Sequence, residues 1–297
     1  MRALPGCSYI LTVLLWLALP RAVAACASCG CGDPTLTAMG QEKPFKNRVR
    51  LALEQRLGAH STGASAEQSL VSRTAVSASW SPLSWLTLGT LAPLIAVRSE
   101  AAQLPARQTV GFGDVELLVR ALVFRDRRFS PRHIIGLLAG LKTPTGPRVS
   151  DSTGYPAPDD GQPGSGSWDG VYGASYGYFG ARGSAFLSAS YRQTTAGYRG
   201  YQRGAVLGAS LAFQFAVNRW SALVLGADFT HTEPSRLDSA TRAPDTGGEL
   251  LAATPGLLFA LHQDVLLRFA LQVPVIQSWR GRQSETATGV VSLVVDL

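Results

Sequence analysis

The stretch VGFGDVELLVRALVFRDRRFSPRHIIGLLAGLKTPTG, residues 110–146, contains two runs in which apolar side chains occupy every second position. The apolar positions are Val115, Leu117, Val119, Ala121 and Val123 in the first run, and Ile135, Leu137, Ala139 and Leu141 in the second. The interleaved face of the first run carries charges, at Asp114, Glu116 and Arg120. Because side chains alternate between the faces of a β-strand, this pattern predicts a hairpin with one apolar face and one mixed face. The polar RDRRFSPR segment between the runs predicts a tight turn.

The composition of the chain is poor in charge. Charged residues make up 16% of the 297 residues and hydrophobic residues 46%, whereas soluble domains average about 25% charged residues. Such a composition suits a protein whose outer surface is not fully solvated. Beyond the N-terminal segment no run approaches the roughly 18 consecutive apolar residues of a membrane-spanning helix, so a helical membrane protein is excluded.

Residues 1–24 have the three parts of a secretory signal peptide. Arg2 supplies the basic region, Tyr9–Leu19 the apolar core and Ala22-Val23-Ala24 the small-residue cleavage site. A short membrane-tethering helix is the alternative, but the apolar core is too short to span a bilayer. Removal of this peptide lowers the formal net charge from +7 to +5, because Arg2 and Arg21 leave. The remaining basic residues form no run, so we expect no nucleic-acid partner.

Residues 25–46 are predicted to form a periplasmic segment that contains Cys26, Cys29 and Cys31. Three interpretations of these thiols stay open. The sequence from Val23 to Cys26 fits a lipoprotein cleavage box, which would acylate Cys26 and leave the other two thiols to pair. The three thiols could instead bind a soft metal or a redox partner, or form a small disulfide knot in an oxidising compartment. A c-type haem is excluded, since a glycine rather than a histidine follows Cys29.

From residue 47 to residue 297 strand-like runs alternate with turns, which predicts an all-β domain. The expected strands are 47–57, 69–80, 84–97, 110–125, 132–143, 167–179, 183–195, 202–217, 219–231, 248–261, 264–275 and 286–297. Most reach the roughly 9–11 residues that a tilted strand needs to cross a bilayer. Their connections are alternately short and long, the long ones including 144–166 and 232–247. We therefore expect a transmembrane antiparallel up-and-down β-barrel of about twelve strands with both ends on the periplasmic side.

Side chains near the strand ends refine this prediction. Aromatic residues expected to form the two girdles of a membrane barrel are Trp80, Trp85, Trp168, Tyr172, Tyr178, Trp220 and Trp279. Pro93, Pro255 and Pro274 fall inside or at the ends of expected strands, so we expect bulges or shorter strands there. If the apolar face meets lipid, a charge at Val119 should block assembly, whereas a charge at Leu118 should be tolerated.

Three short motifs resemble an outer-membrane transporter family. In sequence order they are Gly111-Phe112-Gly113-Asp114-Val115, Leu141-Lys142-Thr143-Pro144-Thr145-Gly146 and Gly164-Ser165-Gly166-Ser167-Trp168-Asp169. Over roughly residues 47–297 the chain is similar to the family named for the MetA pathway of phenol degradation, which is related to channels for hydrophobic aromatics. The resemblance implies a single-chain bacterial outer-membrane barrel and the passage of small solutes, hydrophobic or aromatic ones among them.

The mixed face supplies candidates for a solute path. The charges expected to line the lumen are Arg50, Glu54, Asp114, Glu116, Arg120, Arg192, Asp228 and Arg268. Charges of both signs across a pore would orient or select solutes, although the same charges could simply pair to fill the interior. We expect a channel or transporter in the bacterial outer membrane, with lipid and a small-molecule solute as its partners.

Two other classes of function compete with a channel. An enzyme is not expected and neither is a cofactor. The stretch Gly173-Ala174-Ser175-Tyr176-Gly177 falls inside the expected strand 167–179 and forms no nucleophile elbow, and no histidine pair has metal-ligand spacing. Its histidines are expected at surfaces or interfaces, and they are His60, His133, His231 and His262. The remaining alternative is a structural or partner-docking barrel whose cysteine segment engages a periplasmic redox or metal protein.

Overall fold

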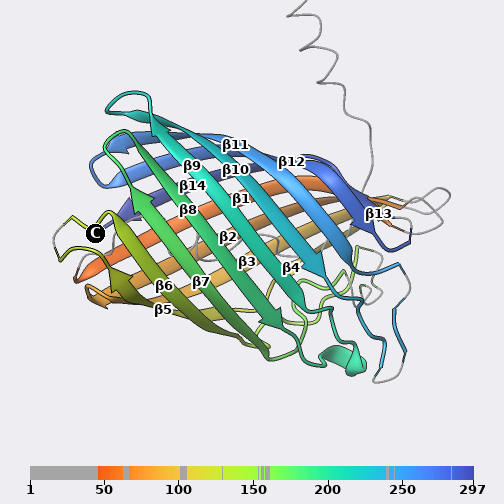
Figure 1. Ribbon diagram of the computed structural model, residues 1–297. Helices are drawn as coiled ribbons and strands as arrows, with labels where there is room; N and C mark the ends of the chain where they lie inside the picture. Colours follow the sequence, from red (N-terminus) through yellow and green to blue (C-terminus); the bar gives the residue numbers. More distant parts are fainter. Residues whose placement is uncertain are drawn as a thin grey trace, which may run out of the picture.

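The structure, a computed structural model, describes residues 46–297 apart from 63–66, 101–105, 129, 153, 155–156, 158–160, 239–240, 244 and 282. The predicted signal peptide and the predicted sites Cys26, Cys29 and Cys31 lie outside the described residues. The described part forms one antiparallel barrel (Figure 1). Its strands are β1 (Arg48–Thr62), β2 (Glu67–Leu83), β3 (Leu86–Glu100), β4 (Arg107–Phe112), β5 (Glu116–Arg125), β6 (His133–Lys142), β7 (Asp169–Phe179), β8 (Gly183–Gln193), β9 (Val206–Ala216), β10 (Ser221–Thr232), β11 (Gly248–His262), β12 (Val265–Trp279), β13 (Gln283–Glu285) and β14 (Thr288–Asp296).

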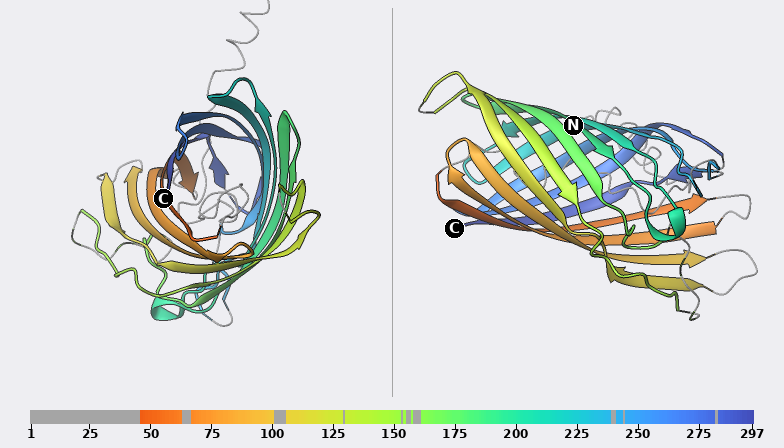
Figure 2. Two further views of the ribbon diagram at one scale, coloured as in Figure 1. Left: turned by 90° about the vertical axis from the view of Figure 1, so that its left-hand side faces the viewer. Right: turned by 90° about the horizontal axis from the view of Figure 1, so that it is seen from below.

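The barrel is closed because the first strand of the described chain pairs with the last one. β1 pairs with β14 from Arg50 opposite Asp296 to Leu57 opposite Gly289, and Figure 2 shows the resulting ring end-on at left. Two positions in the wall each hold two strands, since β4 and β5 both pair with β3, and β13 and β14 both pair with β1. The fourteen strands of the described residues therefore fill twelve positions. The predicted up-and-down barrel of about twelve strands is confirmed.

Short turns connect the strands at one end of the barrel, and the long connections lie at the other (Figure 1). Asn47 and Leu297 both lie at the short-turn end. The Asn47 N–H donates to the Ser81 carbonyl (2.7 Å), and the Val49 N–H donates to the Leu297 carbonyl (3.1 Å). The predicted alternation of connection lengths is therefore confirmed, and the loops beyond β6 and β10 share one rim.

A single carboxylate stabilises the predicted turn between β5 and β6. Asp126 Oδ1 accepts hydrogen bonds from the backbone N–H of Arg132 (2.8 Å) and that of His133 (3.0 Å). These hydrogen bonds favour the charged form of the Asp126 carboxyl and lower its pKa, the one from the His133 N–H more than the one from the Arg132 N–H. Side chain and backbone together thus close this turn at the short-turn rim.

The outer surface of the barrel is apolar. In β5 the side chains of Leu117, Val119 and Val123 are 50%, 43% and 56% exposed, whereas Leu118 between them is 1% exposed. Exposed tryptophans Trp80, Trp85 and Trp220 lie at the short-turn rim, and Trp168 lies at the other. An apolar surface this extensive is stable only against lipid. The barrel is therefore of the transmembrane kind, and its apolar face points outward as predicted.

One predicted girdle residue has a different role. Trp279, at the end of β12, is only partly exposed and lines a cavity inside the barrel. Its indole Nε1–H donates to Gln277 Oε1 (3.2 Å). The prediction that Trp279 belongs to the girdle is therefore wrong, because proximity to a strand end does not fix the side of the wall. No helix among the described residues is long and apolar enough to cross a membrane.

All three prolines lie where strand pairing is irregular. Pro93 of β3 faces the gap between β4 and β5, where the Gly113 N–H donates to the Pro93 carbonyl (2.8 Å). Pro274 of β12 pairs with Ala252 at a register shift of β11. Pro255, by contrast, lies opposite Leu225 in a regular stretch of the β10–β11 ladder. The expected irregularities are confirmed at Pro93 and Pro274. At Pro255 the register does not shift, but Thr254 and Pro255 have no partners in β12.

A hydrophobic cluster covers part of the inner wall. It consists of one buried side chain from each of five strands: Ala75, Leu91, Leu118, Leu138 and Val171. A charge at Leu118 would be buried among apolar neighbours without a partner, which is costly. The prediction that Leu118 tolerates a charge is therefore wrong, because this part of the interior is packed rather than wet.

Replacement of an outward side chain by a charge tests the orientation of the wall. We expect Val119→Arg to lower the free energy of unfolding by about 2–4 kcal/mol if the site lies near the bilayer midplane, because lipid cannot solvate the guanidinium. Urea titration of protein refolded into lipid vesicles measures the change, with Val119→Ile as the matched control. Equal stability of the two variants would show that Val119 does not face lipid.

Candidate functional site

The three motifs of the family resemblance meet on the inner wall at the long-loop end. Strand register places Glu116 of β5 opposite Lys142 of β6, and Lys142 opposite Asp169 of β7. Asp114 lies in the gap between β4 and β5, beside these three residues. Motifs that are far apart in sequence therefore become neighbours through strand pairing.

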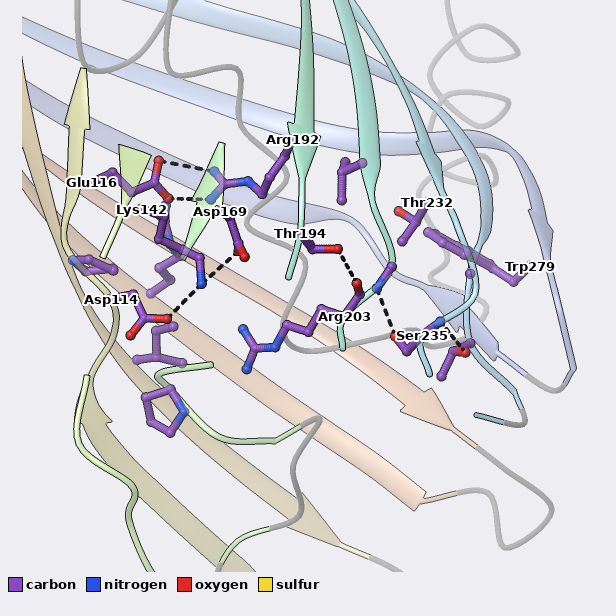
Figure 3. A pocket seen from close by; sticks show the side chains of 18 residues that line it. Asp114, Glu116, Lys142, Asp169, Arg192, Thr194, Arg203, Thr232, Ser235 and Trp279 are labelled. Atoms are coloured by element: carbon purple, nitrogen blue, oxygen red, sulfur yellow. Dashed lines mark hydrogen bonds and ion pairs between the residues drawn. The ribbon is translucent and has the colours of Figure 1, made fainter. Parts of the chain in front are cut away.

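Lys142 lies between two carboxylates. Its Nζ is 2.9 Å from Asp114 Oδ2 and 2.8 Å from Asp169 Oδ2 (Figure 3). All three side chains are almost completely buried, with exposures of 8%, 3% and 2%. A buried charge is tolerated only where it is paired and its remaining hydrogen-bonding capacity is satisfied. The surroundings of these three groups therefore decide whether the arrangement is stable.

Two serines complete the network. Asp114 Oδ2 accepts hydrogen bonds from the Ser165 N–H (2.7 Å) and hydroxyl (2.6 Å), and the Ser167 hydroxyl donates to Asp169 Oδ1 (2.9 Å). Lys142 Nζ also donates to the Ser165 hydroxyl and to that of Ser167 (3.1 Å). We call Asp114, Lys142, Ser165, Ser167 and Asp169 the Lys142 cluster. Its carboxylates and ammonium are satisfied by one another and by the serines.

The Lys142 cluster holds both ends of the connection between β6 and β7. Near the beginning of this connection, the Gly146 N–H donates to Asp114 Oδ1 (3.0 Å). Gly146 also touches Gly164, where an added Cβ on Gly146 would lie 2.8 Å from the Gly164 Cα. Only glycine permits so close an approach of two backbones. The two motif glycines are thus required for the connection to fold back on itself.

The same connection covers the edge of β4 that no strand pairs. The Ser152 N–H donates to the Gln108 carbonyl (2.8 Å), and the Gln108 N–H donates to the Ser152 hydroxyl (3.0 Å). Farther along, Gln162 is 2% exposed and its side chain exchanges hydrogen bonds with both backbone groups of Val149. The β6–β7 connection therefore completes the wall next to β4.

A cavity of about 110 Å³ lies inside the barrel at this level (Figure 3). Its charged lining residues are Arg73, Asp114, Glu116, Lys142, Asp169, Arg192 and Arg203. Hydroxyl groups come from Thr194, Thr232, Ser235 and Thr246, and apolar surface from Pro93, Ile95, Pro163, Val206 and Trp279. The cavity therefore combines charge with an apolar wall, a composition that suits binding of small molecules.

A second ion pair forms one side of the cavity. Arg192 of β8 donates from Nη1 to Glu116 Oε1 (2.9 Å) and from Nη2 to Glu116 Oε2 (3.1 Å) (Figure 3). Such a bidentate arrangement fixes the direction of both side chains. Three of the predicted lumen residues, Asp114, Glu116 and Arg192, thus come together here.

Three other predicted lumen residues lie deeper in the barrel, and none of them lines the cavity. Glu54 of β1 bonds to Arg56 (2.7 Å) and accepts a hydrogen bond from the Ser292 hydroxyl (3.2 Å). Asp228 of β10 accepts hydrogen bonds from the hydroxyls of Ser210 (2.6 Å) and Thr254. Arg268 of β12 lies opposite Ser292 and so belongs to the same region.

Arg50 and Arg120, the remaining predicted lumen residues, lie apart from Glu54, Asp228 and Arg268. Arg50 is bonded to Asp296 at the short-turn end, with 2.7 Å between Arg50 Nε and Asp296 Oδ1. Arg120 is buried in the wall of β5, and its Nη2 donates to the Ser175 hydroxyl over 3.4 Å. Much of the predicted set is therefore ion-paired or hydrogen-bonded. That these residues line a solute path stays a prediction.

Sequence reasoning missed four charged residues of the cavity. Lys142 and Asp169 belong to the motifs quoted above, and Lys142 alternates with outward residues of β6. The sequence could therefore have predicted that these side chains point inward. Arg73 stands on the inner face of β2 and shows the same alternation. Arg203 precedes β9 in an irregular segment, where no periodicity predicts its direction.

Three of the predicted histidines have different local surroundings. His60 is 7% exposed and faces inward in β1, so its predicted surface position is wrong. His133 Nδ1 is 2.7 Å from Tyr176 Oη, and His231 Nδ1 is 3.2 Å from Glu249 Oε1. Within the described ranges, no cluster of three potential metal ligands occurs. The cysteine sites and a docking role for their segment fall outside these ranges.

Comparisons with known proteins show the fold. No family model and no curated protein matches the chain. Among solved structures, an outer membrane channel from Pseudomonas putida F1 has a TM-score of 0.65 at 17% identity, covering 86% of this chain and 98% of that chain. The beta domain of the Bordetella autotransporter BrkA gives 0.53 at 11% identity (85% and 100%), and the translocator domain of autotransporter NalP from Neisseria meningitidis gives 0.51 at 9% (88% and 92%). The fold is that of an outer-membrane β-barrel.

Removal of the central ammonium tests the Lys142 cluster. We expect Lys142→Met to lower the free energy of unfolding by about 3–5 kcal/mol, because two buried carboxylates lose their counter-charge. The control is Arg98→Met, which breaks the exposed pair with Glu100 and should cost less than about 1 kcal/mol. Urea titration in lipid vesicles measures both, and equal losses would contradict a buried network.

Proposed function

We propose that the protein is a passive channel for small solutes across the bacterial outer membrane, with hydrophobic and aromatic compounds among its solutes. The observation that carries this proposal is the contrast between the two faces of the wall. The outer face is an apolar belt suited to lipid, whereas the inner face carries ion pairs, hydroxyl groups and the mixed cavity. A lumen with polar groups at intervals can pass solutes that the lipid excludes.

The structural likenesses support the same function. The matched protein from Pseudomonas putida F1 is itself an outer membrane channel, and it is covered almost completely by the superposition. The mixed lining supports the solute class, since Trp279, Val206 and Ile95 offer apolar contacts beside the ion pairs. The lumen charges then orient solutes as they pass.

Single-channel recording in planar lipid bilayers tests the proposal. Refolded protein is expected to give discrete conductance steps, because ions can follow the polar groups of the lumen. Thr232→Trp places a large side chain in the cavity lining and should reduce the conductance to about half or less. Leu225→Trp is the matched control, since Leu225 lies in the same strand but is 46% exposed on the outer face. A folded barrel without conductance would overturn the proposal.

A further inference from the structure

Cationic side chains outnumber anionic ones around the cavity. The cations are Arg73, Lys142, Arg192 and Arg203, and the anions are Asp114, Glu116 and Asp169. The carboxylates are already engaged, since Lys142 holds two of them and Arg192 holds Glu116 through both of its oxygens. Neither Arg73 nor Arg203 has an ion pair with any described residue. Within the described part of the chain, two positive charges therefore face the cavity without an ion-paired carboxylate.

Arg203 reaches into the cavity from the segment that precedes β9 (Figure 3). Its Nη2 donates to the Gln162 carbonyl (2.6 Å), which fixes the guanidinium at the β6–β7 connection. Its Nε is buried and has no hydrogen-bond acceptor among the described residues. A buried donor without an acceptor is costly, and an anionic oxygen is the acceptor that a guanidinium binds most strongly.

Arg73 lies in an environment of like charge. Strand register places it directly opposite Arg56, and like charges in that position repel each other. The carboxylates that attract it are Glu116 and Glu54, but Arg192 binds the first and Arg56 binds the second. Arg73 thus faces the cavity beside two carboxylates that are each ion-paired with another arginine.

A third arginine extends this arrangement toward the middle of the barrel. Arg268 lies on β12 opposite Ser292, whose hydroxyl bonds to Glu54. Its Nε is buried and lacks an acceptor within the described part of the chain. An anion that leaves the cavity past Arg73 would therefore meet another guanidinium deeper in the lumen.

We propose that the cavity is a binding site for small organic anions, namely carboxylates that carry an apolar body. Arg203 and Arg73 bind the carboxylate, and Trp279, Ile95 and Val206 contact the apolar part. The proposal rests on the channel function and names its solute class. Steering by excess positive charge raises the local concentration of anions and so favours their passage over that of neutral compounds of the same shape.

Benzoate is a suitable probe, with benzyl alcohol as its neutral analogue of similar size. Isothermal titration calorimetry on the refolded barrel measures binding without any need for flux. We expect benzoate to bind and benzyl alcohol to bind at least about tenfold more weakly. Arg73→Gln and Arg203→Gln should each weaken benzoate binding by about tenfold or more. Arg98→Gln removes an arginine from an exposed pair with Glu100 and should leave the affinity unchanged.

Reversal potentials across bilayers in a potassium chloride gradient give an independent readout. The wild-type channel should prefer chloride over potassium, and the preference should fall in Arg73→Gln and Arg203→Gln but not in Arg98→Gln. Equal binding of benzoate and benzyl alcohol, or no binding of benzoate, would overturn the anion site whether or not the barrel conducts. A barrel that binds benzoate through these arginines but passes no current would support the anion-binding site and contradict the proposed channel function.

Discussion

The buried ammonium of Lys142, held between Asp114 and Asp169, is the interaction on which the long-loop half of the barrel depends. Removing three charges from water is costly, and mutual attraction offsets that cost only when the remaining polar groups are satisfied as well. Here Ser165 and the Gly146 N–H satisfy Asp114, while Ser167 serves Asp169. Asp114 lies between β4 and β5, Lys142 on β6 and Asp169 on β7, and their other partners lie in the β6–β7 connection. The charges can therefore be neutralised only when all four segments are in place.

The interruption of the wall explains why such an anchor is needed. Opposite Pro93 the chain leaves the sheet between β4 and β5, so no strand of the described residues pairs with the second edge of β4. Unpaired backbone groups cannot remain exposed to lipid, and the β6–β7 connection supplies partners through Ser152. The connection also brings Pro163 and the acceptor of Arg203 to the cavity. One segment therefore both covers the unpaired edge of β4 and lines the cavity, and the Lys142 cluster sets its position.

Much of the architecture could be predicted from the sequence, because alternation follows directly from strand geometry. The apolar set around Val119 faces outward, and the number of strand positions and the lengths of the connections agree with expectation. Alternation predicts on which side of the wall a side chain lies, but not which residues surround it. It therefore could not show that Leu118 is packed in a cluster or that His60 is buried. The pairing of Lys142 requires the register of three strands, and the direction of Arg203 requires the path of an irregular segment. Neither the pairing of Lys142 nor the direction of Arg203 produces a periodic pattern in the sequence.

The central claim is that the Lys142 cluster fixes the β6–β7 connection against the wall. Hydrogen exchange of the membrane-embedded protein, followed by mass spectrometry, tests this claim most directly at the amides of Gly146 and Ser165. Both donate to the buried Asp114 carboxylate, so peptides that contain them should exchange as slowly as peptides from β6 and should lose this protection in Lys142→Met. Exchange of these amides at the rate of an unstructured loop in the wild-type protein would contradict the account.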